Sequence, residues 1–143
     1  MSTQILYRTA AIATGGRAGH VRGVGGGLDA PLSLPVELGG AGGDGLNPEQ
    51  LFAAGYAACF GSALQFVAGQ RGVHALRDIE VRAEVGIGPR SEGGFGLAVA
   101  LAVAVGGVEE ALARELVAEA HAGCPYSNAL RGNVDVSIDV SLV

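Results

Sequence analysis

The chain has 143 residues and a net charge of −5, with 49% hydrophobic and 16% charged residues. This length suits one domain that can bury a real core, so we predict a single domain over residues 1–143. All nine basic residues are arginines and they form no run, which argues against nucleic acid as a partner, because phosphate binding needs clustered positive charge. The lack of lysine also excludes Schiff-base chemistry and a P-loop lysine.

The hydrophobic share is higher than in a typical soluble domain of this size. An apolar surplus on a small chain has to be buried, which predicts an interface with another subunit. Residues 1–16 contain no basic segment followed by a long apolar stretch, so no secretory signal is expected and a cytoplasmic location is predicted. In that compartment two cysteines are better evidence for redox chemistry, metal binding or simple packing than for a structural disulfide.

The N-terminal third is predicted to form short extended pieces. Residues 5–16 are apolar and prone to form a strand that stops at a glycine pair. Residues 20–38 are broken by glycine and proline, and residues 39–48 form a flexible connector. The connector holds no GxGxxG between a strand and a helix, so nucleotide binding is not predicted.

A helix is predicted from Pro48 to about Gly69. Asn47 can cap it, Pro48 suits the first helical position, and Glu49 falls in the first turn, where it meets the positive end of the helix dipole. The following stretch, residues 51–70, is uncharged and approaches the length of a membrane span. Polar residues interrupt it and no aromatic belt flanks it, so we interpret it as a buried helix surrounded by protein and predict no membrane partner.

The second half alternates strands and one more helix. Residues 78–87 alternate as a half-buried strand, residues 95–105 form a second strand, and residues 133–142 form a third. Residues 108–123 form an amphipathic helix with acids at its start and a glycine at its end. Several strands with two segregated helices predict an α+β fold.

Cys59 lies about ten residues into the first predicted helix, and two interpretations remain open. Free cysteine is among the most buried residue types, so it can be a small apolar filler. A reactive role requires a group that stabilises the thiolate, because an apolar site raises a thiol pKa. Without lysine, that cation would have to be an arginine from elsewhere in the chain.

Cys124 follows the second helix and precedes Pro125, which ends the helix. It can be a residue that tucks inward, or a second thiol on a turn that is free to reach the first. His121 and Cys124 also form an H-x-x-C spacing. Structural zinc sites use two such pairs, however, and only one is present, so no metal is predicted.

Four stretches together resemble the organic hydroperoxide resistance (Ohr) branch of the OsmC/Ohr family. They are "TGGRAGHV", "LGGAGGDGLNPEQLFAAGYAACFGSAL", "GFGLAVAL" and "CPYSNALRGNVDVSIDV". The resemblance runs from about residue 4 to the C-terminus. "NPEQLFAAGYAACF" and "CPYSNA" are its specific parts, since both are long and stand in the right order and separation.

The resemblance implies two central helices wrapped by curved antiparallel sheets in an intertwined homodimer, with active sites at the subunit interface. Cys59 would be the peroxidatic cysteine and Cys124 the resolving one. Arg17 would hold the thiolate and Glu49 would orient Arg17, although each has a plain local explanation as a solvated turn residue and a first-turn acid. Ala18 stands where an acidic residue often follows this arginine, and His20 is nearby, which affects the arginine loop without removing a required group.

The implied activity is a thiol-dependent peroxidase that reduces alkyl and fatty-acid hydroperoxides to alcohols. No bound cofactor is implied; the external reductant would be a lipoyl dithiol on a lipoylated protein. Two alternatives stay open: an OsmC-type peroxidase of the sister branch, and a redox-sensing or binding protein that uses the same disulfide without turnover.

Helix geometry adds one expectation about the subunits. Ten residues separate Glu49 from Cys59, or about 15 Å along a continuous helix. We therefore expect Arg17 and Glu49 to serve Cys59 of the other subunit, unless a kink at Gly55 shortens the path within one chain.

Overall fold

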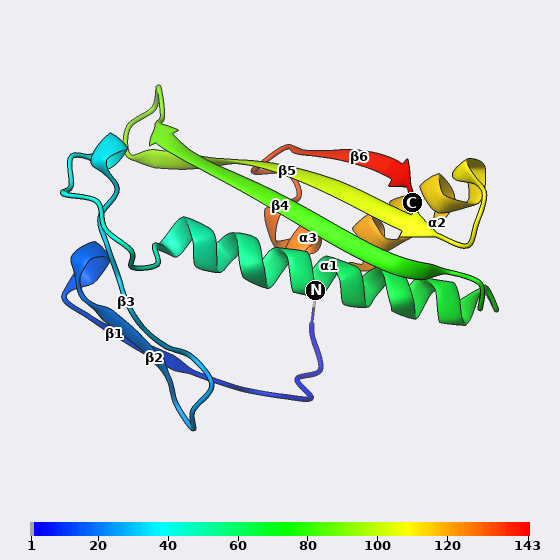
Figure 1. Cartoon of the computed structure of the whole chain (residues 1–143), viewed down its shortest axis with the longest axis horizontal. Coiled ribbons are helices and arrows are strands. Elements are labelled where there is room, and N and C mark those ends of the chain that lie inside the picture. Colours follow the sequence, from blue (N-terminus) through cyan, green and yellow to red (C-terminus); the bar gives the residue numbers. More distant parts are fainter. Residues whose placement is uncertain (1) are drawn as a thin grey trace. The chain divides into compact units, whose positions relative to one another are not determined.

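The computed structural model describes residues 2–143, which form two compact units, residues 2–48 and residues 49–143. The elements of both are labelled in Figure 1. The prediction of one domain over the whole chain stays a prediction.

The first unit is built on a small antiparallel sheet. Its strands β1 (Ala11–Thr14), β2 (His20–Gly23) and β3 (Asp29–Pro31) lie in the order β1-β2-β3. Short 3₁₀ helices span Gly16–Ala18 and Val36–Leu38. The first strand is shorter than the apolar pattern of residues 5–16 indicated, since only its last part pairs with β2.

The second unit combines helices with a second sheet. In chain order it contains α1 (Pro48–Gln70), β4 (Arg77–Pro89), β5 (Phe95–Gly106), α2 (Glu110–Gly123), α3 (Pro125–Leu130) and β6 (Val136–Leu142). Helix α1 begins at Pro48 and ends one residue beyond the predicted Gly69. The predicted α+β fold class is confirmed by this arrangement of helices and two open sheets.

One strand pair departs from the antiparallel sheets that the resemblance implied. Strands β4 and β5 form a long antiparallel hairpin, but β6 pairs parallel to β5, from Val99 opposite Val136 to Val105 opposite Leu142. A parallel neighbour requires a crossover connection, and α2 and α3 supply it. The chain therefore leaves the end of β5, passes through both helices and returns to the start of β6 (Figure 1).

The third helix, α3, was not predicted from the sequence. Pro125 ends α2, as expected, but it also occupies the first position of a new short helix, where its missing N–H is not needed. Cys124 is the residue between the two helices. Its backbone is extended, with φ −64° and ψ 126°, so the chain changes direction at this residue.

The core of the second unit lies between α1, one face of the sheet, and α2. Helix α1 contributes a stripe at every fourth residue, namely Tyr56, Phe60, Leu64 and Ala68. The sheet contributes the alternate residues of β5 that the sequence predicted, Val99, Leu101, Val103 and Val105, and α2 contributes Ala113, Leu116, Val117 and Ala120. Burial of these side chains, each worth about 1.5–3 kcal/mol for the large ones, fixes α1 against the sheet.

Outside this stripe, α1 is less buried than the sequence indicated. It is long and apolar enough to cross a membrane by length and composition alone, yet only 22% of its most apolar window is buried within the chain. Phe66 is 66% exposed. Within the second unit, the prediction of a helix surrounded by protein therefore holds for one face of α1 only.

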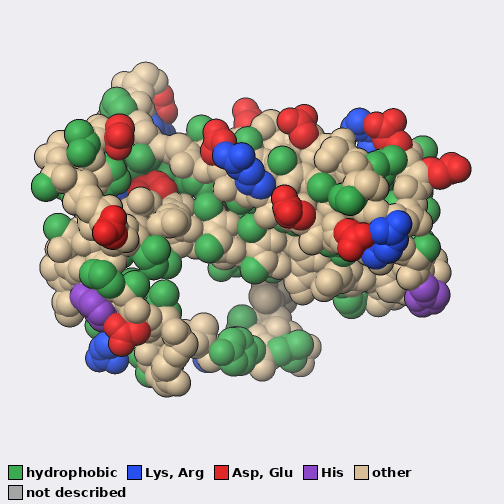
Figure 2. Space-filling model, viewed as in Figure 1, with side chains coloured by type: hydrophobic (Ala, Val, Ile, Leu, Met, Phe, Trp, Pro, Cys, Tyr) green, Lys and Arg blue, Asp and Glu red, His purple; other side chains and the backbone are tan. Residues whose placement is uncertain are grey.

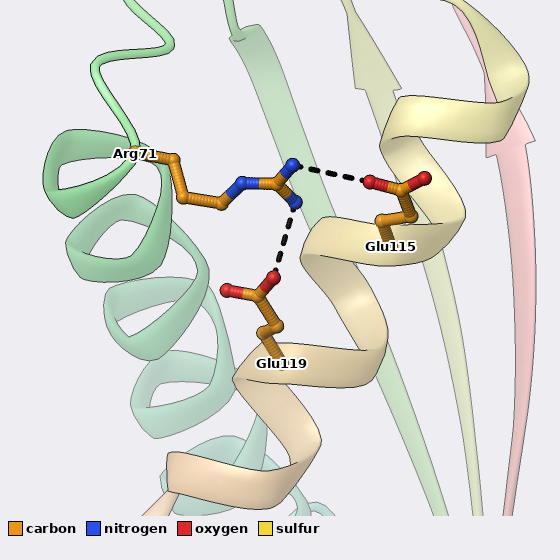
Figure 3. A network of polar contacts seen from close by, with 3 residues as sticks. All are labelled: Arg71, Glu115 and Glu119. Atoms are coloured by element: carbon orange, nitrogen blue, oxygen red, sulfur yellow. Dashed lines mark hydrogen bonds and ion pairs between the residues drawn. The ribbon is translucent and has the colours of Figure 1, made fainter.

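An ion-pair network ties the end of α1 to α2 (Figure 3). The guanidinium of Arg71, just after α1, lies 3.1 Å from Glu115 and 3.1 Å from Glu119, which are one turn apart on α2. The groups are largely solvated, so each contact contributes about 0–1 kcal/mol. Elsewhere, acidic and arginine side chains intermix on the face viewed in Figure 2.

Candidate functional site

The two cysteines lie together in the second unit. Cys59 is in the middle of α1 and Cys124 lies between α2 and α3, and their Sγ atoms are 3.6 Å apart. Both are free thiols. Cys124 is fully buried, whereas Cys59 is partly exposed. Residues 65 positions apart in sequence are thus placed within reach of a disulfide, whose S–S bond is about 2 Å long.

The surroundings of Cys59 act on its thiol in opposite directions. Burial raises the pKa of Cys59, and the neighbouring thiol of Cys124 raises it further. The backbone N–H of Tyr126 donates to the Cys59 sulfur, which lowers the pKa but does not offset burial. These surroundings therefore favour the protonated thiol, and a positive charge beside the sulfur would shift it toward the thiolate.

A buried chain of hydrogen bonds lies beside the cysteine pair, and sequence analysis missed it. The Tyr56 hydroxyl is 2.6 Å from Oγ of Ser127, and Nδ1 of His121 is 2.8 Å from the same oxygen. Tyr56 and Ser127 are both buried. These residues stand in the motifs that carry the family resemblance or next to them, but their spacing alone gave no sign that they meet.

The pKa shifts indicate that both ends of this chain of hydrogen bonds are uncharged at neutral pH. Burial raises the pKa of Tyr56, so its phenol stays protonated and can donate to Ser127. Burial, and then the charge of Arg131, lowers the pKa of His121, so its ring stays neutral at neutral pH. A neutral ring can accept at Nδ1 when its proton is on Nε2. A chain in which Tyr56 donates to Ser127 and Ser127 donates to His121 is one arrangement that these uncharged groups allow.

Aromatic rings cover the N-terminal side of the pair. The ring centroids of Phe52 and Tyr56 both lie near that of Tyr126, at 6.3 Å and 6.0 Å. Gly55 leaves the space for the Tyr126 ring, since a Cβ at this position would lie 3.2 Å from it. The small residue in α1 therefore allows α3 to approach closely.

An apolar groove opens at Cys59 on the opposite side. It has a volume of about 490 Å³ and is lined by Cys59, Ser62, Ala63, Phe66, Val67, Gly123 and Pro125. All of these residues belong to the second unit. The more exposed of the two thiols thus faces an apolar space, while Cys124 is sealed behind it.

Arg17 lies in the first unit, half-buried in the 3₁₀ turn between β1 and β2. Glycine is required in this turn: Gly15 has φ +76°, and a Cβ on Gly19 would lie 1.7 Å from the carbonyl oxygen of Thr14. His20 follows the turn, and its Nε2 lies 2.7 Å from Oδ1 of Asp29 on β3. The role predicted for Arg17 stays a prediction.

Glu49 occupies the first turn of α1, as predicted. The helix runs without interruption from Pro48 through Gly55 to Cys59 and beyond. Ten residues of helix place the Glu49 backbone about 15 Å from that of Cys59 along the axis. The structure therefore brings Cys59 and Cys124 together but leaves Glu49 a distant neighbour on the same helix.

Within residues 2–143, no group of three or more His, Cys, Asp or Glu side chains gathers in a way that could hold a metal ion. His121, the candidate partner of Cys124 in a zinc site, hydrogen-bonds Ser127 instead. The fold and the site thus define an α+β protein with a pair of neighbouring thiols, one on its long helix α1 and one between α2 and α3.

Comparison with known proteins identifies the family. Residues 40–139 match the family described as OsmC-like protein. The organic hydroperoxide resistance protein of Xanthomonas axonopodis pv. citri is 51% identical over 138 residues, which cover 96% of each chain. The chain therefore belongs to the OsmC/Ohr family, and within it to the organic hydroperoxide resistance branch.

Solved structures agree with this assignment. A crystal structure from Legionella pneumophila, described as an organic hydroperoxide resistance protein OsmC, has a TM-score of 0.91 and 51% identity, and the match covers 96% of this chain and 99% of that one. The OhrB structure from Bacillus subtilis has a TM-score of 0.86 and 44% identity over 95% of this chain and 99% of that one.

The lowered pKa of His121 predicts a pH-dependent stability. Below the pKa of about 6.5 that histidine has when unfolded, the unfolded chain binds a proton that the folded chain does not, so the free energy of unfolding falls as pH falls. Replacing His121→Gln removes this contribution. Between about pH 7.5 and about pH 5.5, the urea midpoint should fall less in His121→Gln than in the wild type. Equal falls would contradict this; His74→Gln, at an exposed histidine, is the control and should keep the wild-type dependence.

Proposed function

We propose that this protein is a cysteine-based peroxidase that reduces organic hydroperoxides to alcohols, acting as a cytoplasmic homodimer. The observation that carries the proposal is the pair of free thiols 3.6 Å apart, one of which opens onto an apolar groove. The substrate class comes from the similar proteins, which are named organic hydroperoxide resistance proteins.

The positions of the two thiols support their division of roles. Cys59 faces the groove, so its thiolate attacks the distal peroxide oxygen; an S–O bond forms, the O–O bond breaks, and the alkoxide leaves as the alcohol after it takes up a proton. Cys59 is now a sulfenic acid. The buried Cys124 then attacks the Cys59 sulfur, an S–S bond forms, and the sulfenic oxygen leaves as water.

Arg17 is the proposed cation for the thiolate, oriented by Glu49. The need for it follows from the second unit, where burial raises the pKa of Cys59. A guanidinium can pair with a thiolate and a carboxylate at once, and in a dry site this pairing lowers the thiol pKa. The family resemblance selects Arg17 from the nine arginines.

The groove supports a preference for bulky alkyl and fatty-acid hydroperoxides over hydrogen peroxide. Its apolar lining, with Phe66, Val67 and Pro125, removes an alkyl chain from water, which contributes about 0.8 kcal/mol per buried CH₂. Hydrogen peroxide gains nothing from this contact.

The uncovered apolar face of α1 supports the homodimer. Only 22% of the most apolar window of α1 is buried, and such an apolar surface is not expected to face water in a stable protein. A second copy of the same chain can cover it without the need for a different protein. The reductant is proposed to be a lipoyl dithiol on a lipoylated protein, which cleaves the disulfide by thiol exchange and restores both thiols.

Turnover with a defined reductant tests the activity. Pure protein with tert-butyl hydroperoxide should consume it continuously with dihydrolipoamide as sole reductant, and thioredoxin with its reductase should support much less consumption. Cys59→Ser should abolish turnover, because no sulfenic acid can form. If peroxide forms the disulfide stoichiometrically but neither reductant supports turnover, the protein is a redox sensor and not a peroxidase.

Mixed dimers test the sharing of the site between subunits. Cys59→Ser and Glu49→Ala proteins are each expected to be inactive or nearly so. If Arg17 and Glu49 serve the partner's thiol, a mixed dimer contains one complete site and should recover about half of the wild-type activity per dimer. Differently tagged subunits verify the exchange. No recovery in verified mixed dimers would place the whole site within one chain.

A further inference from the structure

We infer that Tyr56, Ser127 and His121 are positioning residues for the resolving step, holding Cys124 where it can attack the oxidised Cys59. This inference rests on the proposed peroxidase function and assigns a role to side chains that the proposed mechanism leaves unused. It starts from the contacts between α1 and α3.

Two contacts between α1 and the α3 segment follow the same spacing. Cys59 meets Cys124, and three residues earlier on α1 Tyr56 meets Ser127, three residues after Cys124. Residues three apart lie on one helical face, so these are neighbouring contacts across one interface. The Tyr56–Ser127 hydrogen bond of 2.6 Å therefore fixes the register of α3 on α1, and with it the position of Cys124 relative to Cys59.

His121 extends the constraint to α2. Its ring reaches across the turn to Ser127, at 2.8 Å, and its backbone carbonyl accepts a hydrogen bond of 2.8 Å from Arg131. Cys124 lies between these points: its N–H donates to the Ala120 carbonyl at 2.7 Å, and its own carbonyl accepts from the Asn128 N–H at 2.9 Å. The backbone of the turn is thus held from both sides.

The sulfurs have only a short distance to travel. From 3.6 Å they must approach by about 1.5 Å to reach the length of an S–S bond. Rotation of side chains can supply this, provided that the backbones of α1 and α3 stay in register. A buried hydrogen bond suits this task better than apolar packing, because a slipped register would leave the buried Tyr56 hydroxyl without its partner Ser127.

The step itself needs no additional reactant. The Cys124 sulfur attacks the sulfur of the Cys59 sulfenic acid, the S–O bond breaks, and the Cys124 proton leaves with the oxygen as water. The residues Tyr56, Ser127 and His121 exchange no atoms or electrons in this step. They act through the position of Cys124.

Single-turnover kinetics separate the two steps. Reduced Tyr56→Phe and Ser127→Ala proteins are mixed with one equivalent of tert-butyl hydroperoxide. Samples are quenched with acid at set times, and the remaining peroxide and the disulfide-containing protein are then quantified, the protein by mass spectrometry. Peroxide loss should stay within about twofold of wild type, whereas disulfide formation should be about tenfold slower. Cys59 should consequently be overoxidised to sulfinic acid at peroxide concentrations that the wild type tolerates.

The controls remove hydroxyls elsewhere. Ser137→Ala and Ser141→Ala, at exposed positions on β6, should match wild type in both steps. The Tyr56→Phe/Ser127→Ala double variant should be no slower than the slower single variant, because the same hydrogen bond is lost once. Equal slowing of both steps, or unchanged disulfide formation, would overturn the inference.

A glutathione equilibrium keeps this test independent of the peroxidase proposal. The ratio of disulfide to dithiol between Cys59 and Cys124, measured in glutathione buffers, gives their effective concentration without any peroxide. It should fall about fivefold or more in Tyr56→Phe and in Ser127→Ala. If the wild type forms no disulfide with peroxide, the proposed function fails, while the glutathione result still decides the positioning role: an unchanged or higher effective concentration would refute it.

Discussion

The packing of α3 against α1 is the constraint on which the rest of this site depends. A thiol in the middle of an apolar helix is inert by default, and its partner comes from a turn 65 residues away. Gly55 leaves room for the Tyr126 ring, and Tyr56 hydrogen-bonds Ser127, so the short helix lies close against the long one. The crossover connection from β5 to β6 contains Cys124 and passes beside α1. The parallel pairing of β5 and β6, which requires this connection, therefore helps to place the second thiol next to the first.

Much of the fold could be predicted from the sequence because its signals are local. Pro48 set the start of α1, the alternation of residues 78–87 and 95–105 gave β4 and β5, and the glycines around Arg17 indicated its turn. The parallel pairing of β6 could not be predicted, since the same alternation of residues fits either strand direction. The helix after Cys124 was not predicted either, because Pro125 indicated only the end of the preceding helix. The hydrogen bonds among Tyr56, Ser127 and His121 could not be predicted, because only the tertiary fold brings α1 and α3 together.

The electrostatics of Cys59 connect the site to the proposed assembly. A backbone N–H lowers the pKa of the Cys59 thiol, and burial outweighs it. The helix that carries this thiol is also only 22% buried in its most apolar window. In the proposed homodimer, a second subunit that covers α1 and supplies Arg17 would meet both requirements together, and reactivity would then depend on dimerisation.

In the proposed function, Cys59 and Cys124 of one chain form a redox pair. Peptide mapping of the pure protein after treatment with one equivalent of an organic hydroperoxide, without reductant, tests this pairing. We expect a disulfide between the peptides that contain Cys59 and Cys124, in a species that stays a single chain under denaturing, non-reducing conditions. Disulfide-linked dimers, or a sulfinic acid at Cys59 with Cys124 still a free thiol, would contradict it.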